Sequence, residues 1–174
     1  RTYGGGTTAR TKCEVSWIAP PPALTADVAG MFFSPEALER PGGGCEDLQV
    51  LRYLQGGGYS MHHDGNARAL TVLYYLNGVG ETWLPLADAP PRPTNGEDAM
   101  ARGAKLDPDT DGVRVTAPAA GDALAFFSLD DTDGSYDWSA VHRALPSTGE
   151  KWVANHWLRI GGLGAPAPDP REDV

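Results

Sequence analysis

The chain has 174 residues, which is enough for one domain with a full hydrophobic core and too few for two ordinary domains. Its 41% hydrophobic and 21% charged residues are typical of a globular protein, and its 22 glycines and 15 prolines indicate many turns. The net charge of −9, without any cluster of Lys and Arg, argues against nucleic acid as a partner, and no apolar run approaches the roughly 20 residues of a membrane span.

The first part of the chain predicts one strand followed by two short helices. Polar and apolar residues alternate over 13–18, which indicates a strand. A helix is predicted over 25–33 with Thr25 as its N-cap, and a second helix over 35–40 with Ser34 as its N-cap.

From residue 47 onward, short apolar and aromatic runs separated by glycines predict strands with tight turns. The predicted strands cover 48–54, 59–63, 67–76, 81–86, 113–117, 122–127, a segment around His142, and 151–160. Between them, a Pro-, Asp- and Gly-rich stretch over about 87–111 has no periodicity and predicts a mobile surface loop. The residues at 165–174 lose all pattern and predict a frayed tail.

These elements predict a mainly β fold with a short helical N-terminal part. Short antiparallel strands without alternating helices favour a two-sheet barrel or sandwich of the jelly-roll, cupin-like kind. We expect one domain over 1–174, with a helical preface at about 24–40 and a β core at about 46–160. A Rossmann-type fold is disfavoured, because the glycine triplets lack the helix that a phosphate-binding loop needs.

Three residues have the chemistry of a metal site. Alternate side chains of a strand point to the same face, so His62 and Asp64 would face one ion while His63 points away. His142 is the candidate for a third ligand. Two histidines and one carboxylate, with three positions left open, form the facial triad of non-haem iron oxygenases. The alternative is a metal-free hairpin, because Asp64 begins an Asp-Gly turn dipeptide.

Several sequence blocks surround these residues in a fixed order. They are EDLQVLRY at 46–53, GGYSMHHD at 57–64, RALTVLYYLN at 68–77, GETWLP at 80–85, GDALAFF at 121–127 and GEKWVANHWLR at 149–159. In this order they resemble the prolyl 4-hydroxylase family, over about 46 to 160. The resemblance implies a double-stranded β-helix that hydroxylates peptidyl proline to 4-hydroxyproline and converts 2-oxoglutarate to succinate. It also implies Fe(II), O2, and ascorbate as reductant.

The resemblance further assigns a cosubstrate site. Lys151, on the strand after His142, would pair its ammonium with the distal carboxylate of 2-oxoglutarate. Tyr53 and Thr82 match family positions that hydrogen-bond the same carboxylate. The alternatives are a surface lysine and ordinary sheet packing.

Four further residues match the family's peptide-binding surface beside the iron. Tyr59 and Trp157 would offer aromatic faces to a proline ring, and Arg68 would hold backbone carbonyls. Glu46 matches another position near that groove. The alternatives are core aromatics and solvated charged side chains. The expected partner is a proline-containing peptide or protein.

The chain departs from the family pattern in regions that could shape the substrate groove. From His142 to Lys151 it is one residue shorter than usual, with Leu145 where a cysteine is common. The connection after Asp64 is shortened, and 87–111 is an insertion. Two alternatives therefore stay open: an oxygenase acting on a free amino acid or another small or protein substrate, and a catalytically silent metal-binding module. The resemblance implies the endoplasmic reticulum lumen for a eukaryotic source and the cytoplasm for a bacterial or viral one.

Overall fold

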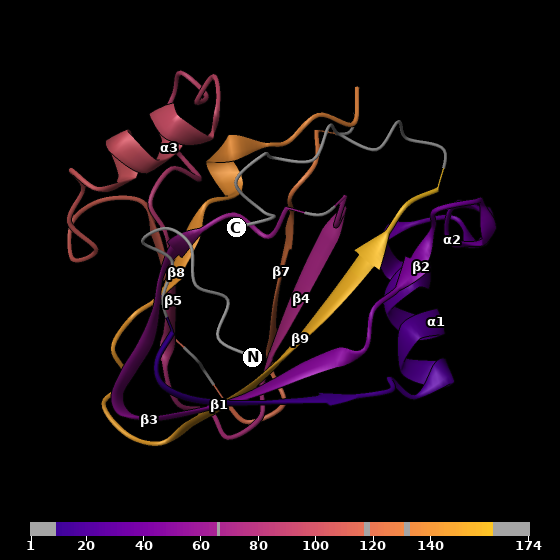
Figure 1. The fold of residues 1–174 in the computed structure, drawn as a ribbon, viewed down its shortest axis with the longest axis horizontal. Coiled ribbons are helices and arrows are strands. Elements are labelled where there is room, and N and C mark those ends of the chain that lie inside the picture. The colour runs from indigo at the N-terminus through magenta and orange to yellow at the C-terminus, as the bar shows by residue number, and fades with distance from the viewer. Residues whose placement is uncertain (1–9, 66, 117–118, 131–132, 162–174) are drawn as a thin grey trace.

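Antiparallel strands form the body of the protein in a computed structural model that describes residues 10–65, 67–116, 119–130 and 133–161 (Figure 1). The elements in chain order are β1 (Arg10–Ile18), α1 (Pro22–Phe32), α2 (Pro35–Glu39), β2 (Gly44–Cys45), β3 (Leu48–His62), β4 (Leu70–Tyr75), β5 (Glu81–Leu84), α3 (Gly96–Gly103), β6 (Val113–Thr116), β7 (Ala123–Phe127), the 3-10 helix η1 (Trp138–Ala140), β8 (His142–Ala144) and β9 (Lys151–Arg159). No helix among the described residues is long and apolar enough to cross a membrane.

The strands follow the order β6-β5-β8-β3-β9-β4-β7, with β1 added on β3 and β2 added on β9. The long strand β3 organises this barrel, because its first half pairs with β1 and β9 and its last residues pair with β8. In Figure 1, β3 sweeps across the bottom of the view and rises to β8 on the left, so it belongs to both halves of the barrel. The predicted mainly β architecture with N-terminal helices is therefore confirmed.

Strand β4 is buried along almost its whole length because both of its faces are covered. Leu73 and Tyr75 point into a cluster inside the barrel with Leu51, Tyr53 and Val153. Leu70 and Val72 alternate to the other face and pack with Val28 and Ala29 of α1 and with Leu158. The alternation follows from the two-residue period of a strand, and the N-terminal helices thus seal the outside of the sheet that carries the site.

Helix α1 begins three residues earlier than expected. Its N-cap is Pro21, so the predicted cap Thr25 lies inside the helix, where its hydroxyl contacts Nε2 of His156 at 3.3 Å. A proline in the first turn suits a helix start because the missing N–H has no helical partner there. Ser34 is the N-cap of α2 as predicted. The strands predicted at 48–54 and 59–63 form the single strand β3.

The prediction of an irregular loop over 87–111 is wrong for its central part, which forms α3. The side chain of Asn95 accepts a hydrogen bond from the backbone N–H of Asp98, and the Asp98 carboxylate accepts one from the N–H of Thr94. This reciprocal cap satisfies N–H groups that would otherwise have no partner. Ala99, fully buried, then packs against Leu86 and Val141. The tail predicted at 165–174 lies outside the described residues.

Candidate metal centre

His62, Asp64 and His142 converge at one end of the barrel. His62 ends β3 and His142 begins β8, and the two residues are direct partners in the antiparallel pairing of these strands. Asp64 follows two residues after His62 and places its carboxylate 3.7 Å from Nε2 of His62 and 3.9 Å from Nε2 of His142. One ligand atom from each residue lies within 4.8 Å of the others, as a shared metal ion requires. The predicted convergence of the three side chains is therefore confirmed.

Backbone carbonyls orient both imidazoles toward the same point. Nδ1 of His62 lies 2.9 Å from the carbonyl oxygen of Ser60, and Nδ1 of His142 lies 3.1 Å from that of Ala140. A ring whose Nδ1–H donates to a carbonyl keeps its Nε2 lone pair for a metal. The two histidines are thus held in the tautomer that a ligand needs.

The charge state of the cluster also suits a divalent cation. Burial, together with the neighbouring His142, lowers the pKa of His62, which favours the neutral imidazole. Burial acts to raise the pKa of Asp64, but the adjacent imidazoles and a hydrogen bond from Thr71 hold it below its usual value. Two neutral imidazoles and one carboxylate are a donor set for Fe(II) and related metals. The residues present therefore fit the metal that the sequence implies.

Asp64 is held in place by two side chains from the sheet behind it. The hydroxyl of Thr71 donates to Oδ2 at 2.6 Å, and the indole N–H of Trp157 donates to the same oxygen at 3.1 Å. Trp157 is only 2% exposed, so it offers no face to a peptide, and its expected place on the substrate surface is wrong. Its indole orients a metal ligand instead. Neither contact has a signal in the sequence, because both depend on how β4 and β9 pack.

Arg68 and Glu46 form an ion pair beside Asp64. The guanidinium of Arg68 donates through Nε and Nη2 to the two carboxylate oxygens of Glu46, each at 2.8 Å, and through Nη1 to the backbone oxygen of Asp64 at 3.0 Å. It also lies 3.7 Å from the ring centre of Trp157. Arg159 adds a second contact to Glu46 at 2.7 Å. The structure thus brings two predicted substrate residues together next to the metal centre.

Tyr59 lies directly against a metal ligand. The ring centre of Tyr59 is 3.8 Å from that of His62. The guanidinium of Arg10, on β1, lies 4.3 Å from the ring centre of Tyr59. The side chain is partly exposed. Tyr59 is therefore a predicted substrate residue whose ring lies against one of the candidate metal ligands.

Lys151 is a buried cation inside the barrel, only 1% exposed. Its ammonium donates to the backbone oxygen of Glu81 at 3.2 Å and lies 5.6 Å and 5.7 Å from the ring centres of Tyr53 and Tyr75. Burial lowers the pKa of Lys151 to about 8. Within the described residues no carboxylate forms an ion pair with it, and a buried ammonium without a counterion is costly. The position is therefore suited to an anionic group that enters the barrel.

Three hydroxyl groups share this part of the barrel. Thr82 is fully buried and accepts a hydrogen bond from the Tyr75 hydroxyl at 2.8 Å. Tyr53 faces Lys151 across the pairing of β3 with β9. Tyr75 was not singled out as a site residue from the sequence, although it lies within the block at 68–77. The cluster of one ammonium and three hydroxyls can hold a carboxylate by charge and by hydrogen bonds.

Comparisons with known proteins agree with this chemistry. Residues 48–159 match the family described as the 2OG-Fe(II) oxygenase superfamily. A putative prolyl 4-hydroxylase of Acanthamoeba polyphaga mimivirus is 33% identical over 134 residues, which cover 66% of this chain and 45% of that protein. The probable prolyl 4-hydroxylase 4 of Arabidopsis thaliana is 38% identical over 132 residues, which cover 66% and 42%. The chain thus spans less than half the length of these relatives.

Solved structures show the same fold. The viral collagen prolyl hydroxylase of Paramecium Bursaria Chlorella virus-1, in its 2OG complex, matches with a TM-score of 0.59 and 22% identity over 86% of this chain and 78% of that chain. A Trichoplax adhaerens prolyl hydroxylase, in complex with a peptide fragment of hypoxia inducible factor, matches with a TM-score of 0.53 and 18% identity over 84% and 62%. The predicted jelly roll and the predicted resemblance to prolyl hydroxylases are therefore confirmed.

Proposed function

Because the chain belongs to the 2OG-Fe(II) oxygenase superfamily, we propose that it hydroxylates proline in peptides to 4-hydroxyproline, with 2-oxoglutarate and O2 as cosubstrates. The observation that carries the proposal is a triad of metal ligands in the same barrel as a buried ammonium that has no ion-pair partner within the described ranges. The names of the curated relatives, which are prolyl 4-hydroxylases, support proline as the target.

His62, Asp64 and His142 would hold Fe(II) and leave three positions for the cosubstrates. When bound, the iron with 2-oxoglutarate and O2 supplies the oxidation, with succinate and CO2 as coproducts and ascorbate as the expected reductant. The side chains of this protein place and shield the reactants. Thr71 and Trp157 fix the Asp64 carboxylate, which leaves little freedom in the direction of the metal.

Lys151 would bind the distal carboxylate of 2-oxoglutarate, which would provide the missing counterion. The hydroxyl of Thr82 and the phenol of Tyr53 would complete the site by hydrogen bonds, and Tyr75 would orient Thr82. Because Lys151 is buried, charge pairing there would be stronger than at the surface.

Tyr59, Arg68 and Glu46 would form the wall that receives the peptide. Tyr59, whose partly exposed ring packs on His62 and contacts the guanidinium of Arg10, would pack against a proline ring beside the metal ligands. Arg68 and Glu46 fix each other by two hydrogen bonds and would present charged and polar atoms to the peptide backbone. Trp157 belongs to the support of Asp64.

The test is succinate formation by protein reconstituted with Fe(II), given 2-oxoglutarate, ascorbate and a poly-proline peptide, with mass spectrometry of the peptide. We expect the peptide to gain one oxygen. His142→Ala should form neither succinate nor oxidised peptide, and Lys151→Ala should be active only at high concentrations of 2-oxoglutarate. Succinate without peptide oxidation would favour the alternative of a free amino acid or another substrate. If no condition gives succinate, the protein is a catalytically silent metal-binding module and the proposal fails.

A further inference from the structure

Each histidine ligand ends a three-residue unit of the same construction. The units are 60–62 and 140–142, and in both the backbone oxygen of the first residue faces Nδ1 of the ligand, at 2.9 Å and 3.1 Å. Successive side chains of an extended segment point to opposite sides, so the middle residues, Met61 and Val141, point away from the metal. The backbone of these two residues therefore sets where each imidazole is held.

The middle residues of both units pack under the helix α3. Val141 is fully buried in a cluster with Leu86 and with Ala99 of α3, and Met61 packs against the same cluster. At Gly103 the helix comes so close that a Cβ would lie 2.5 Å from Sδ of Met61. In Figure 1, α3 lies outside the barrel, beside the helical turn η1 that precedes β8. One helix therefore covers the outer side of both segments whose inner side carries a ligand.

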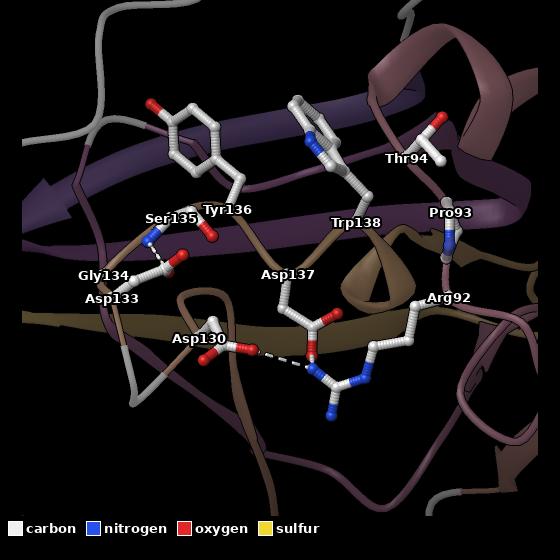
Figure 2. A pocket seen from close by; sticks show the side chains of 10 residues that line it. All are labelled: Arg92, Pro93, Thr94, Asp130, Asp133, Gly134, Ser135, Tyr136, Asp137 and Trp138. Atoms are coloured by element: carbon white, nitrogen blue, oxygen red, sulfur yellow. Dashed lines mark hydrogen bonds and ion pairs between the residues drawn. The ribbon is translucent and has the colours of Figure 1, made fainter.

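The insertion that carries α3 is held together by its own hydrogen bonds. The guanidinium of Arg102 donates to the backbone oxygens of Pro91 at 2.7 Å and Ala89 at 3.1 Å. Arg92 pairs with Asp130 at 3.0 Å, as the dashed line in Figure 2 shows. A pocket of about 560 Å³ lies between these two segments, next to the start of α3. Because α3 joins the barrel beside a hollow, it can open locally while the barrel stays folded.

We propose that α3 is a positioning element for the metal centre. When α3 is in place, Met61 and Val141 are fixed, and the two imidazoles keep the carbonyl contacts that direct Nε2 to the metal. When α3 opens, both units lose their outer contacts and the ligands lose that orientation, which weakens metal binding. Ala99 and Gly103 are thus positioning residues that act through the side chains beneath them. This role rests on the metal centre of the proposed function and is independent of the substrate.

Metal binding must in turn hold α3 in place, because the coupling between two sites is reciprocal. An ion bound to both histidines fixes the units 60–62 and 140–142 from the inner side, and the fixed side chains keep the surface on which α3 packs. A helix that served stability alone would lack this response. The two directions of the coupling are measured independently.

The first measurement is the Kd for Mn(II) of the metal-free protein, by calorimetry. Ala99→Glu places a carboxylate at a fully buried position and displaces α3 from the cluster. Ala101→Glu makes the same change at an exposed position of the same helix and is the control. We expect the Kd to rise about tenfold in Ala99→Glu, as for the loss of other supports of metal ligands, and to stay unchanged in Ala101→Glu. Charge alone would act in the opposite direction, since a nearby carboxylate attracts a cation.

The second measurement is hydrogen exchange of the wild-type protein, followed by mass spectrometry with and without Mn(II). We expect the metal to slow exchange in α3 severalfold, because a bound metal reduces its local opening. Exchange in α1 should change less, since that helix packs on Leu70, Val72 and Leu158 and not on the histidine units. In Ala99→Glu the effect of the metal on α3 should disappear.

An unchanged Kd in a folded Ala99→Glu protein, or exchange in α3 that does not respond to Mn(II), would overturn the proposal. If Ala99→Glu does not fold, Val141→Ala replaces it, because this variant removes the methyl groups on which α3 packs. Val115→Ala, on β6, is then the control. A Kd raised severalfold in Val141→Ala alone supports the role of α3, and equal Kd values reject it.

Failure of the proposed function has a different signature. A wild-type protein that binds Mn(II) but oxidises no peptide with Fe(II) refutes the hydroxylase, and the Kd and exchange values still decide the role of α3. A wild-type protein that binds no Mn(II) would overturn both.

Discussion

Lys151 is a residue whose proposed role in binding conflicts with the stability of the fold. An ammonium that is only 1% exposed has lost its water and, within the described part of the chain, has gained a single carbonyl and no carboxylate. Burial therefore lowers the pKa of Lys151 from 10.5 to about 8. At neutral pH the folded state carries this charge at a cost, and the cost falls when an anion binds.

We expect Lys151→Met to stabilise the free protein at pH 7 by up to about 3 kcal/mol, because the lowered pKa of Lys151 corresponds to a cost of that size. Between pH 8 and 10.5 the lysine is protonated in the unfolded chain and deprotonated in the folded protein. The stability of the wild type should therefore rise with pH through that window, and the stability of the variant should not. Urea unfolding at several pH values measures both. Lys105→Met, at an exposed lysine, is the control. A variant less stable than the wild type at pH 7 would contradict the argument.

If the same ammonium binds 2-oxoglutarate as proposed, the affinity for 2-oxoglutarate should depend on pH. The distal carboxylate would need the protonated form of Lys151, which declines above the pKa of about 8. We expect KM for 2-oxoglutarate to rise as pH increases from 7 to 9.5, and Lys151→Arg, whose guanidinium stays charged, to flatten this rise. A KM that is independent of pH in the wild type would show that Lys151 does not bind the carboxylate.

Thr71 should tune the metal site without touching the metal. Thr71→Val keeps the shape of the side chain and removes the hydroxyl that donates to Oδ2 of Asp64. We expect the affinity for Mn(II) to fall about tenfold or more, as is usual when a partner of a metal ligand is lost. Titration of the metal-free protein by calorimetry measures the change, and Thr110→Val, at an exposed threonine, is the control. Equal affinities would mean that Trp157 alone is enough to orient the carboxylate.

At the scale of elements, the turn between β4 and β5 controls where Lys151 lies. Gly80 has a φ of +106°, and a Cβ at this position would collide with the Lys151 side chain. We expect Gly80→Ala to move the ammonium and raise KM for 2-oxoglutarate, while the affinity for Mn(II) stays unchanged. Gly30→Ala, on α1 with open space around it, is the matched control. A Gly80→Ala protein with a normal KM would show that the lysine tolerates displacement.

The sequence predicted those parts of the site that depend on local spacing. His62 and Asp64 share a face because they are two positions apart on an extended segment, and His142 completes a known donor set. Thr71 and Trp157 could not be predicted, because the pairing of β4 with β9 alone brings them to Asp64. Such contacts arise from tertiary structure, and no local pattern records them.

The helix α3 was missed for a different reason. Its eight residues are too few for a clear apolar stripe, and prolines and glycines surround them. The signal that could have found it is the reciprocal cap of Asn95 and Asp98, with Thr94 before it. For a short helix, the capping residues predict the helix better than the periodicity of its apolar residues does.

At the scale of the whole molecule, a metal ion would join two distant parts of the chain. His62 ends β3 and Asp64 follows two positions later, whereas His142 begins β8, late in the chain. We expect Mn(II) at 100 times its Kd to stabilise the fold by about 2.7 kcal/mol, reversibly on chelation, since a ligand of the folded state alone has this effect. The thermal unfolding midpoint measures it. An equal shift in His142→Ala would place the binding elsewhere.

The continuity of β3 has a consequence for which acids the barrel can accept. Tyr53, opposite Lys151, and the ligand His62 lie on this one strand, so backbone geometry sets the spacing between ammonium and metal. If Lys151 and the metal hold the two ends of the cosubstrate as proposed, the barrel would select acids by the length of their carbon chain. A 2-oxo diacid one carbon shorter would leave the buried ammonium unpaired, and one carbon longer would not fit between the two ends. Because an unpaired buried charge is costly, this discrimination should be steep.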